Sequence, residues 1–110
     1  MAASEADSNR NALVCNLGVM TEAERTRYLA LSRKLMRATE ERRELADGFE
    51  FCIESDQISL VEIAEWITFE RRCCPFFKLQ IEAAPDDGPV ALRMTGAAGI
   101  KEFILAEIGG

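Results

Sequence analysis

Apolar residues at helical spacing predict a long first helix. After Thr21 they recur every three or four positions, while charged residues crowd the opposite face. The stripe consists of Tyr28, Leu31, Leu35, Ala38 and Leu45, and is widened by Leu29 and Met36. Thr21 and Glu24 have the spacing of a capping box, in which each side chain accepts a hydrogen bond from the other residue's backbone N–H. The pattern predicts a helix over residues 22–45.

A second helix is delimited at both ends by residues with a known local effect. Ser59 and Glu62 have the spacing of another capping box, so the helix is expected to start near residue 60. Its core stripe is Leu60, Ile63, Ala64 and Ile67. Pro75 disfavours the helical conformation at the residue before it, which is Cys74. The helix is therefore predicted to end close to Cys73.

Three segments alternate apolar and polar residues, which is the period of a half-buried strand. The first follows the turn signal Asp47-Gly48 and covers residues 49–54. The second and third cover residues 77–83 and 90–95, and the turn-forming Pro-Asp-Asp-Gly-Pro between them predicts a hairpin. Gly99 precedes a short last helix.

The order helix-strand-helix-strand-strand-helix predicts an α+β fold. Strands with one apolar face suit a three-stranded, mainly antiparallel sheet with its helices on one face. The first and third strands are predicted to be neighbours. Residues 1–12 are predicted to form a disordered tail, and residues 13–110 a single α+β domain. The long helix over residues 22–45 is a candidate homodimer contact.

Charge and composition narrow the classes of partner. The formal net charge is -6 and the pI is about 4.7, which argues against nucleic acid because phosphate binding needs a basic surface. No apolar run approaches the roughly 20 residues of a membrane span, so no membrane partner is expected. The first dozen residues lack the pattern of a signal peptide. The expected location is cytoplasmic, where thiols tend to be catalytic, redox-active or metal-binding.

The cysteines carry the candidate chemistry, since the chain has four of them and no histidine. Adjacent helical side chains diverge by about 100°, but the bend at Pro75 allows Cys73 and Cys74 to converge. Cys15, in an apolar loop before the first helix, is the natural third thiol, whereas Cys52 falls on the polar face of a strand. Two or three thiolates suit soft ions of low coordination number, such as copper(I), mercury(II) or trivalent arsenic. Cys15, Cys73 and Cys74 are therefore the predicted metal ligands.

The same residues also permit redox catalysis. One of Cys73 and Cys74 would attack a substrate and the other would resolve the product. Arg71 and Arg72 would favour the thiolate, and Glu70 would relay a proton or pair with an arginine. A direct disulfide between the adjacent cysteines would be strained, because their Cα atoms are only about 3.8 Å apart. Trp66 and Phe69 would either wall a pocket or belong to the core.

The cysteine segment also supports a resemblance to a known family. The runs EWITFERRCCPFFKLQIE and GPVALRMTGAAGIKEFI, with LVCNLGVMT and DGFEF upstream, resemble a family of small uncharacterised bacterial proteins. Its mark is a Trp-containing helix that ends in a Cys-Cys-Pro-Phe motif. The resemblance implies that Cys15, Glu70, Cys73 and Cys74 belong to the family pattern and that Cys52 does not. It implies no mechanism.

Three functions follow as hypotheses. The first is a thiol-based binding protein for a soft metal or metalloid ion of the copper(I), mercury(II) or arsenite class, so that the partner is a metal ion or a small thiol-reactive ligand. The second is a thiol redox enzyme or sensor that uses the Cys73/Cys74 pair, with Glu70. The third is a small dimeric interaction domain with inert cysteines.

Overall fold

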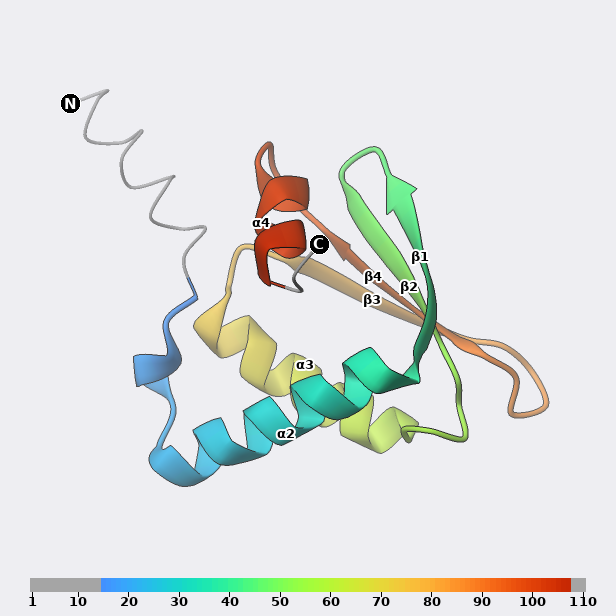
Figure 1. Cartoon of the computed structure of the whole chain (residues 1–110), viewed down its shortest axis with the longest axis horizontal. Helices are drawn as coiled ribbons and strands as arrows, with labels where there is room; N and C mark the ends of the chain where they lie inside the picture. Colours follow the sequence, from blue (N-terminus) through green and yellow to red (C-terminus); the bar gives the residue numbers. More distant parts are fainter. Residues whose placement is uncertain (1–14, 108–110) are drawn as a thin grey trace.

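Three α-helices pack against a four-stranded antiparallel sheet in the part of the chain that the structure describes, residues 15–107 of a computed structural model (Figure 1). The helical elements are the short 3-10 helix η1 (Leu17–Val19), α2 (Glu22–Ala38), α3 (Leu60–Cys73) and α4 (Ile100–Glu107). The strands are β1 (Thr39–Leu45), β2 (Gly48–Ile53), β3 (Lys78–Ala83) and β4 (Val90–Thr95). The α+β class is as predicted, but the sheet has four strands and not three.

The additional strand is β1, and it corrects the predicted first helix. Residues 39–45 were expected to continue the helix, but α2 ends at Ala38. At the end of α2 the Thr39 hydroxyl donates to the Leu35 carbonyl over 2.9 Å, and the backbone of Thr39 is already extended. Residues 39–45 then pair antiparallel with β2 through a tight turn. The hydrogen bonds of this pairing override the helical preference of a Glu- and Arg-rich segment.

The strand order is β1-β2-β4-β3, and every neighbouring pair is antiparallel. The predicted hairpin is the β3–β4 pair, and the predicted neighbours are β2 and β4. Phe51 lies opposite Leu92 and Phe49 lies opposite Met94 in the two central strands. These side chains line the buried face of the sheet.

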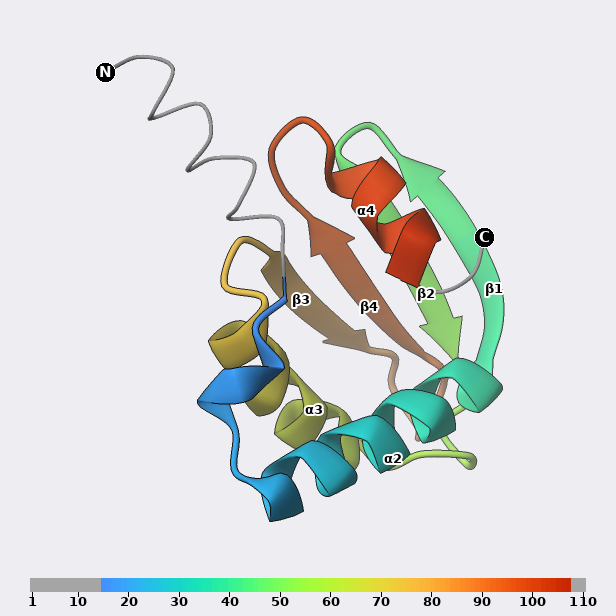
Figure 2. The same cartoon turned by 60° about the vertical axis from the view of Figure 1, so that its left-hand side comes forward.

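One hydrophobic core joins the sheet to all three helices. Buried side chains of α2, α3 and α4 form a single cluster with the apolar face of β2 and β4. In Figure 2, α4 crosses in front of the sheet. The helix residues of the cluster include Leu31, Leu35, Ile63, Trp66, Ile100 and Ile104. The predicted placement of the helices on one face agrees with this packing.

The predicted helix starts and the end of α3 are confirmed. Both capping boxes are formed, with the Thr21 and Ser59 hydroxyls each accepting from the backbone N–H of the glutamate three residues later over 3.1 Å. Cys74 leaves the helical region with φ -128° and ψ 71°. This fixes the last turn of α3, on which Glu70 and Cys73 lie.

Some predictions fall outside what the structure describes. The predicted tail over residues 1–12 lies outside residues 15–107, and so do both ends of the predicted domain. No helix within residues 15–107 is long and apolar enough to cross a membrane. A homodimer through residues 22–45 stays a prediction. These residues form α2 and the edge strand β1 and not one helix.

Candidate functional site

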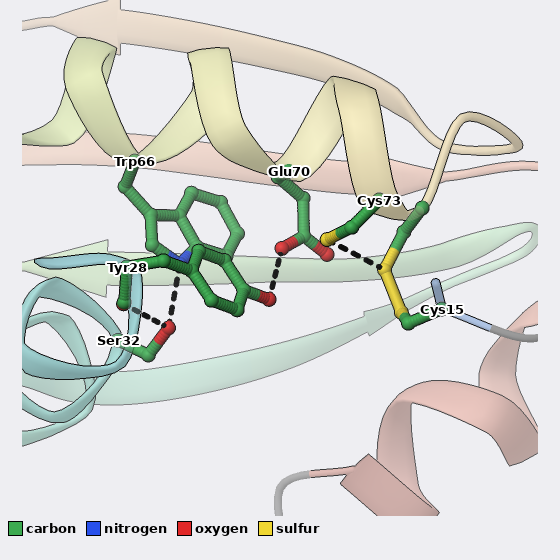
Figure 3. The surroundings of a disulfide bond; sticks show 7 residues. Cys15, Tyr28, Ser32, Trp66, Glu70 and Cys73 are labelled. Carbon is green, nitrogen blue, oxygen red and sulfur yellow. Dashed lines mark hydrogen bonds between the residues drawn. A yellow bond between two sulfur atoms is a disulfide. The ribbon is translucent and has the colours of Figure 1, made fainter. Parts of the chain in front are cut away.

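The loop before α2 brings Cys15 to the end of α3. The backbone N–H of Asn16 donates to the Cys73 carbonyl over 2.8 Å, so the two segments are joined directly. Cys15 and Cys74 form a disulfide, with Cα atoms 4.6 Å apart, inside the usual range of roughly 4.4–6.8 Å. The Cys73 Sγ lies 3.6 Å from the Cys74 Sγ (Figure 3). All three sulfur atoms lie within 4.8 Å of one another.

The sulfur cluster is buried. Cys73 and Cys74 are fully inaccessible to solvent and form a small core with Met20, while Cys15 is half-buried at its edge. Four aromatic side chains pack around this group, Tyr28, Phe69, Phe76 and Phe77. The predicted ligands Cys15, Cys73 and Cys74 are therefore brought together, in a dry environment.

The structure separates Cys52 from this cluster. Cys52 is a free, partly buried cysteine of β2, opposite Ala91 of β4. It alternates with the buried Phe51 and Ile53, so it lies on the face of the sheet away from the helices. The predicted position of Cys52, on the polar face of the sheet and away from the helices, agrees with the structure.

Glu70 lies one turn before the cysteines and is buried, with 4% of its surface exposed. Its carboxylate accepts a hydrogen bond of 2.6 Å from the Tyr28 hydroxyl (Figure 3). Burial raises the pKa of Glu70 to about 7, although the Tyr28 bond opposes the shift. The nearby Arg72 instead contacts Glu24 at 3.0 Å and the Val19 carbonyl at 2.8 Å. Of the two expectations for Glu70, a pairing with Arg72 is therefore not what the structure shows.

The same burial acts on the free thiol of the cluster. The pKa of the Cys73 thiol is raised, first by its burial and then by the nearby Glu70 carboxylate. Arg72 acts in the opposite direction but is a smaller influence. The net shift of the Cys73 pKa is therefore upward, against the expectation that the arginines would favour a thiolate.

Two residues of the site are not indicated by the sequence pattern, Tyr28 and Ser32. Trp66 donates through its indole N–H to the Ser32 hydroxyl over 3.0 Å, and that hydroxyl donates to the Tyr28 carbonyl over 2.9 Å (Figure 3). The helical spacing assigns Tyr28 only to the apolar stripe. The sequence carried only a partial signal, because a buried tyrosine or tryptophan needs a hydrogen-bond partner. The partners themselves, Glu70 for Tyr28 and Ser32 for Trp66, lie far away along the chain.

A cavity of about 670 Å³ lies beside the sulfur cluster, between the helices and the sheet. Its wall includes Cys15, Glu70, Tyr28 and Trp66, together with apolar side chains such as Phe103 of α4. Trp66 is therefore both a core residue and a cavity residue, whereas Phe69 packs against the core and is not part of the wall. A free thiol and a disulfide next to an apolar cavity can, once the disulfide is reduced, hold a small thiophilic ligand.

No family model, no curated protein and no solved structure matches this chain. The resemblance to bacterial proteins with a Cys-Cys-Pro-Phe motif is therefore not tested and stays a prediction. The functional conclusions rest on the site itself.

Proposed function

We propose that this protein binds trivalent arsenic between the sulfur atoms of Cys15, Cys73 and Cys74. The observation that carries the proposal is the convergence of three sulfurs within 4.8 Å of one another. Two sulfur–ion bonds of about 2.3 Å that span the 3.6 Å from Cys73 to Cys74 enclose an angle of about 100°. Such an angle suits an ion of low coordination number with pyramidal geometry.

The burial of the cluster favours arsenic among the soft ions. Arsenous acid exchanges three hydroxyl groups for three thiols and releases three waters, so the product As(SR)₃ is neutral. Copper(I) held by three thiolates would leave a charge of minus two. Burying uncompensated charge is costly, and Glu70, the buried acidic residue next to the cluster, gives no compensation. Mercury(II) also forms a neutral complex, with two thiolates, and its separate titration distinguishes it from arsenic.

Binding requires the reduced protein. The Cys15–Cys74 disulfide takes up two electrons and two protons from a dithiol or small-molecule thiol, which is itself oxidised to a disulfide. A reducing compartment such as the cytoplasm keeps protein thiols in this state. The cytoplasmic location is thus part of the proposal.

A metal titration tests the proposal. The chain is reduced with a phosphine under anaerobic conditions, the phosphine is removed, and arsenite, copper(I) and mercury(II) are titrated separately. We expect one arsenic per chain, and an affinity that is at least about tenfold lower in Cys73→Ser and Cys73→Ala, because one of three bonds is lost. Cys52→Ser is the matched control, since Cys52 lies on the other face of the sheet. Equally weak arsenite binding by wild type and the Cys73 variants would refute the proposal.

A second candidate function is thiol–disulfide exchange, and the Cys15–Cys74 disulfide favours it. An external thiolate would attack one of the two sulfurs, form a mixed disulfide with it and release the other as a thiolate. Cys73, 3.6 Å from Cys74 Sγ, would then attack a mixed disulfide at Cys74, forming a strained Cys73–Cys74 disulfide and releasing the external thiol as a thiolate. The measurement is the rate of exchange with glutathione. A rate no faster than that of an unstructured peptide disulfide would exclude this function.

A further inference from the structure

We infer that the arsenic compound bound by this site carries one organic group, and that the cavity beside Cys15 receives this group. The inference rests on the proposed function and names its ligand class. Inorganic arsenite needs only the space between three sulfurs. A cavity of about 670 Å³ is far larger, and falls in the range of about 300–1,000 Å³ that holds small organic ligands.

The cavity joins the thiols to an apolar space. Of the three cysteines, Cys15 forms part of the wall, so a ligand atom bonded to its sulfur can direct a substituent inward. Leu35, Trp66, Phe77 and Phe103 contribute aliphatic and aromatic surface. An aryl or alkyl group would be buried there, and burying apolar surface is favourable.

The buried polar side chains of the wall are engaged with one another, whereas Glu107 is an exposed carboxylate of the wall. The Tyr28 hydroxyl donates to Glu70 over 2.6 Å, and Ser32 accepts from the Trp66 indole over 3.0 Å (Figure 3). No buried side-chain nitrogen or oxygen within residues 15–107 lacks a hydrogen-bond partner. The buried part of the wall therefore favours an apolar group over a strongly polar ligand.

An entrance is formed by apolar residues that face solvent. Leu29 and Met36 of α2, each 42% exposed, line the cavity, as does Leu17. They explain why the predicted apolar stripe of α2 is wider than its buried core. An exposed apolar rim is typical of a binding site.

The chemistry needs two thiols and not three. A monosubstituted arsenic(III) compound, RAs(OH)₂, exchanges two hydroxyl groups for the thiols of Cys15 and Cys74. Two As–O bonds break, two As–S bonds form, and two water molecules carry away the thiol protons. The As–C bond stays intact. Both thiols come from the two-electron reduction of the Cys15–Cys74 disulfide by a dithiol. Cys73 therefore supplies the third As–S bond to arsenite and is dispensable for the organic compound.

The test compares three arsenic(III) probes on the reduced full-length chain: phenylarsine oxide, methylarsonous acid and arsenite. The affinity of the protein for phenylarsine oxide is divided by its affinity for methylarsonous acid. This ratio is then divided by the same ratio measured for a free dithiol, so that the different intrinsic affinities of the two compounds for thiols cancel. We expect this normalised ratio to be about ten or more, because the phenyl group buries more apolar surface. It should persist in Cys73→Ser, in which the affinity for arsenite is at least about tenfold lower.

A variant at the entrance and a matched control test whether the phenyl group lies in the cavity. Met36→Glu adds a carboxylate to the cavity rim and should lower the normalised ratio at least about threefold. Thr26→Glu adds the same charge to an exposed position of α2 that does not line the cavity, and should leave the ratio unchanged.

The outcomes separate this inference from the proposed function. A normalised ratio near one, with arsenite still bound through Cys73, would overturn the organic ligand and leave arsenic binding in place. A high ratio that Met36→Glu does not lower would place the phenyl group outside the cavity, which also overturns the inference. Failure of all three probes to bind the reduced chain would refute both.

Discussion

At the scale of single residues, the fold buries the Glu70 carboxyl and raises its pKa. This carboxyl is buried at the end of α3, shares a hydrogen bond with Tyr28 and has a pKa raised to about 7. A raised carboxyl pKa means that the folded state holds the proton more tightly than the unfolded state does. The free energy of unfolding must therefore decrease as the pH rises from about 4.5 towards 7.

Glu70→Gln should remove this pH dependence, because glutamine does not titrate. For a pKa raised from the ordinary value of 4.5 to about 7, the wild-type protein should lose about 2 kcal/mol of unfolding free energy between pH 5 and pH 7.5. Urea unfolding of both proteins at the two pH values measures the difference. An equal loss in wild type and Glu70→Gln would show that Glu70 does not titrate in this range.

The residue scale also shows what the sequence can and cannot predict about the site. Pro75 next to Cys74 was enough to predict where α3 ends, and the bend there allowed the two adjacent sulfur atoms to converge. The position of Cys15 depends on a backbone hydrogen bond from Asn16 to Cys73, between segments 57 residues apart. No local pattern encodes such a contact. The hydrogen bond between Tyr28 and Glu70 spans 42 residues, so the sequence pattern does not predict it either.

At the scale of elements, the two helix starts and β2, β3 and β4 were predictable because capping boxes and alternating apolar residues are local signals. β1 was not predictable in this way. Its sequence is TEERREL, and its middle five residues are exposed, so it has no apolar alternation. It is held by pairing with β2, and its charged side chains protect the edge of the sheet from other chains.

Gly48 is the residue on which the β1–β2 hairpin and its packing against β4 depend. A Cβ atom at Gly48 would collide with the Met94 carbonyl oxygen and lie 2.8 Å from Thr95 Cα, both of them backbone atoms. Gly48→Ala should therefore lower the free energy of unfolding by about 2–3 kcal/mol, measured by urea unfolding. Ala46→Ser, at an exposed position of the same turn, is the control. A Gly48→Ala variant as stable as this control would contradict the described pairing of β2 with β4.

At the scale of the whole molecule, the Cys15–Cys74 disulfide ties the first described residue to the end of α3 across 59 residues. A crosslink of this span restricts the unfolded chain, and the chain-entropy estimate is about 4 kcal/mol. Reduction of the wild-type protein should lower its unfolding free energy by up to about this amount. Cys15→Ser should show no such response to reductant. A wild-type stability that is the same with and without reductant would mean that the disulfide does not constrain the unfolded chain.

This link gives the molecule two states with different chemistry. The oxidised state is crosslinked between the N-terminal loop and α3 and has a single free thiol in the cluster, Cys73. The reduced state offers three thiols beside an apolar cavity. Stability and ligand binding are therefore expected to change in opposite directions on reduction.

Whether the three sulfurs form one arsenic site is tested most directly by X-ray absorption at the arsenic edge, on the reduced protein loaded with one equivalent of arsenite. We expect three As–S bonds of about 2.3 Å, similar to other thiolate bonds, and no oxygen bonded to arsenic. Cys73→Ser should show at most two such bonds, and Cys52→Ser should match wild type. Arsenic surrounded by oxygen in the wild-type protein, or a spectrum unchanged by Cys73→Ser, would rule out a site built from these three cysteines.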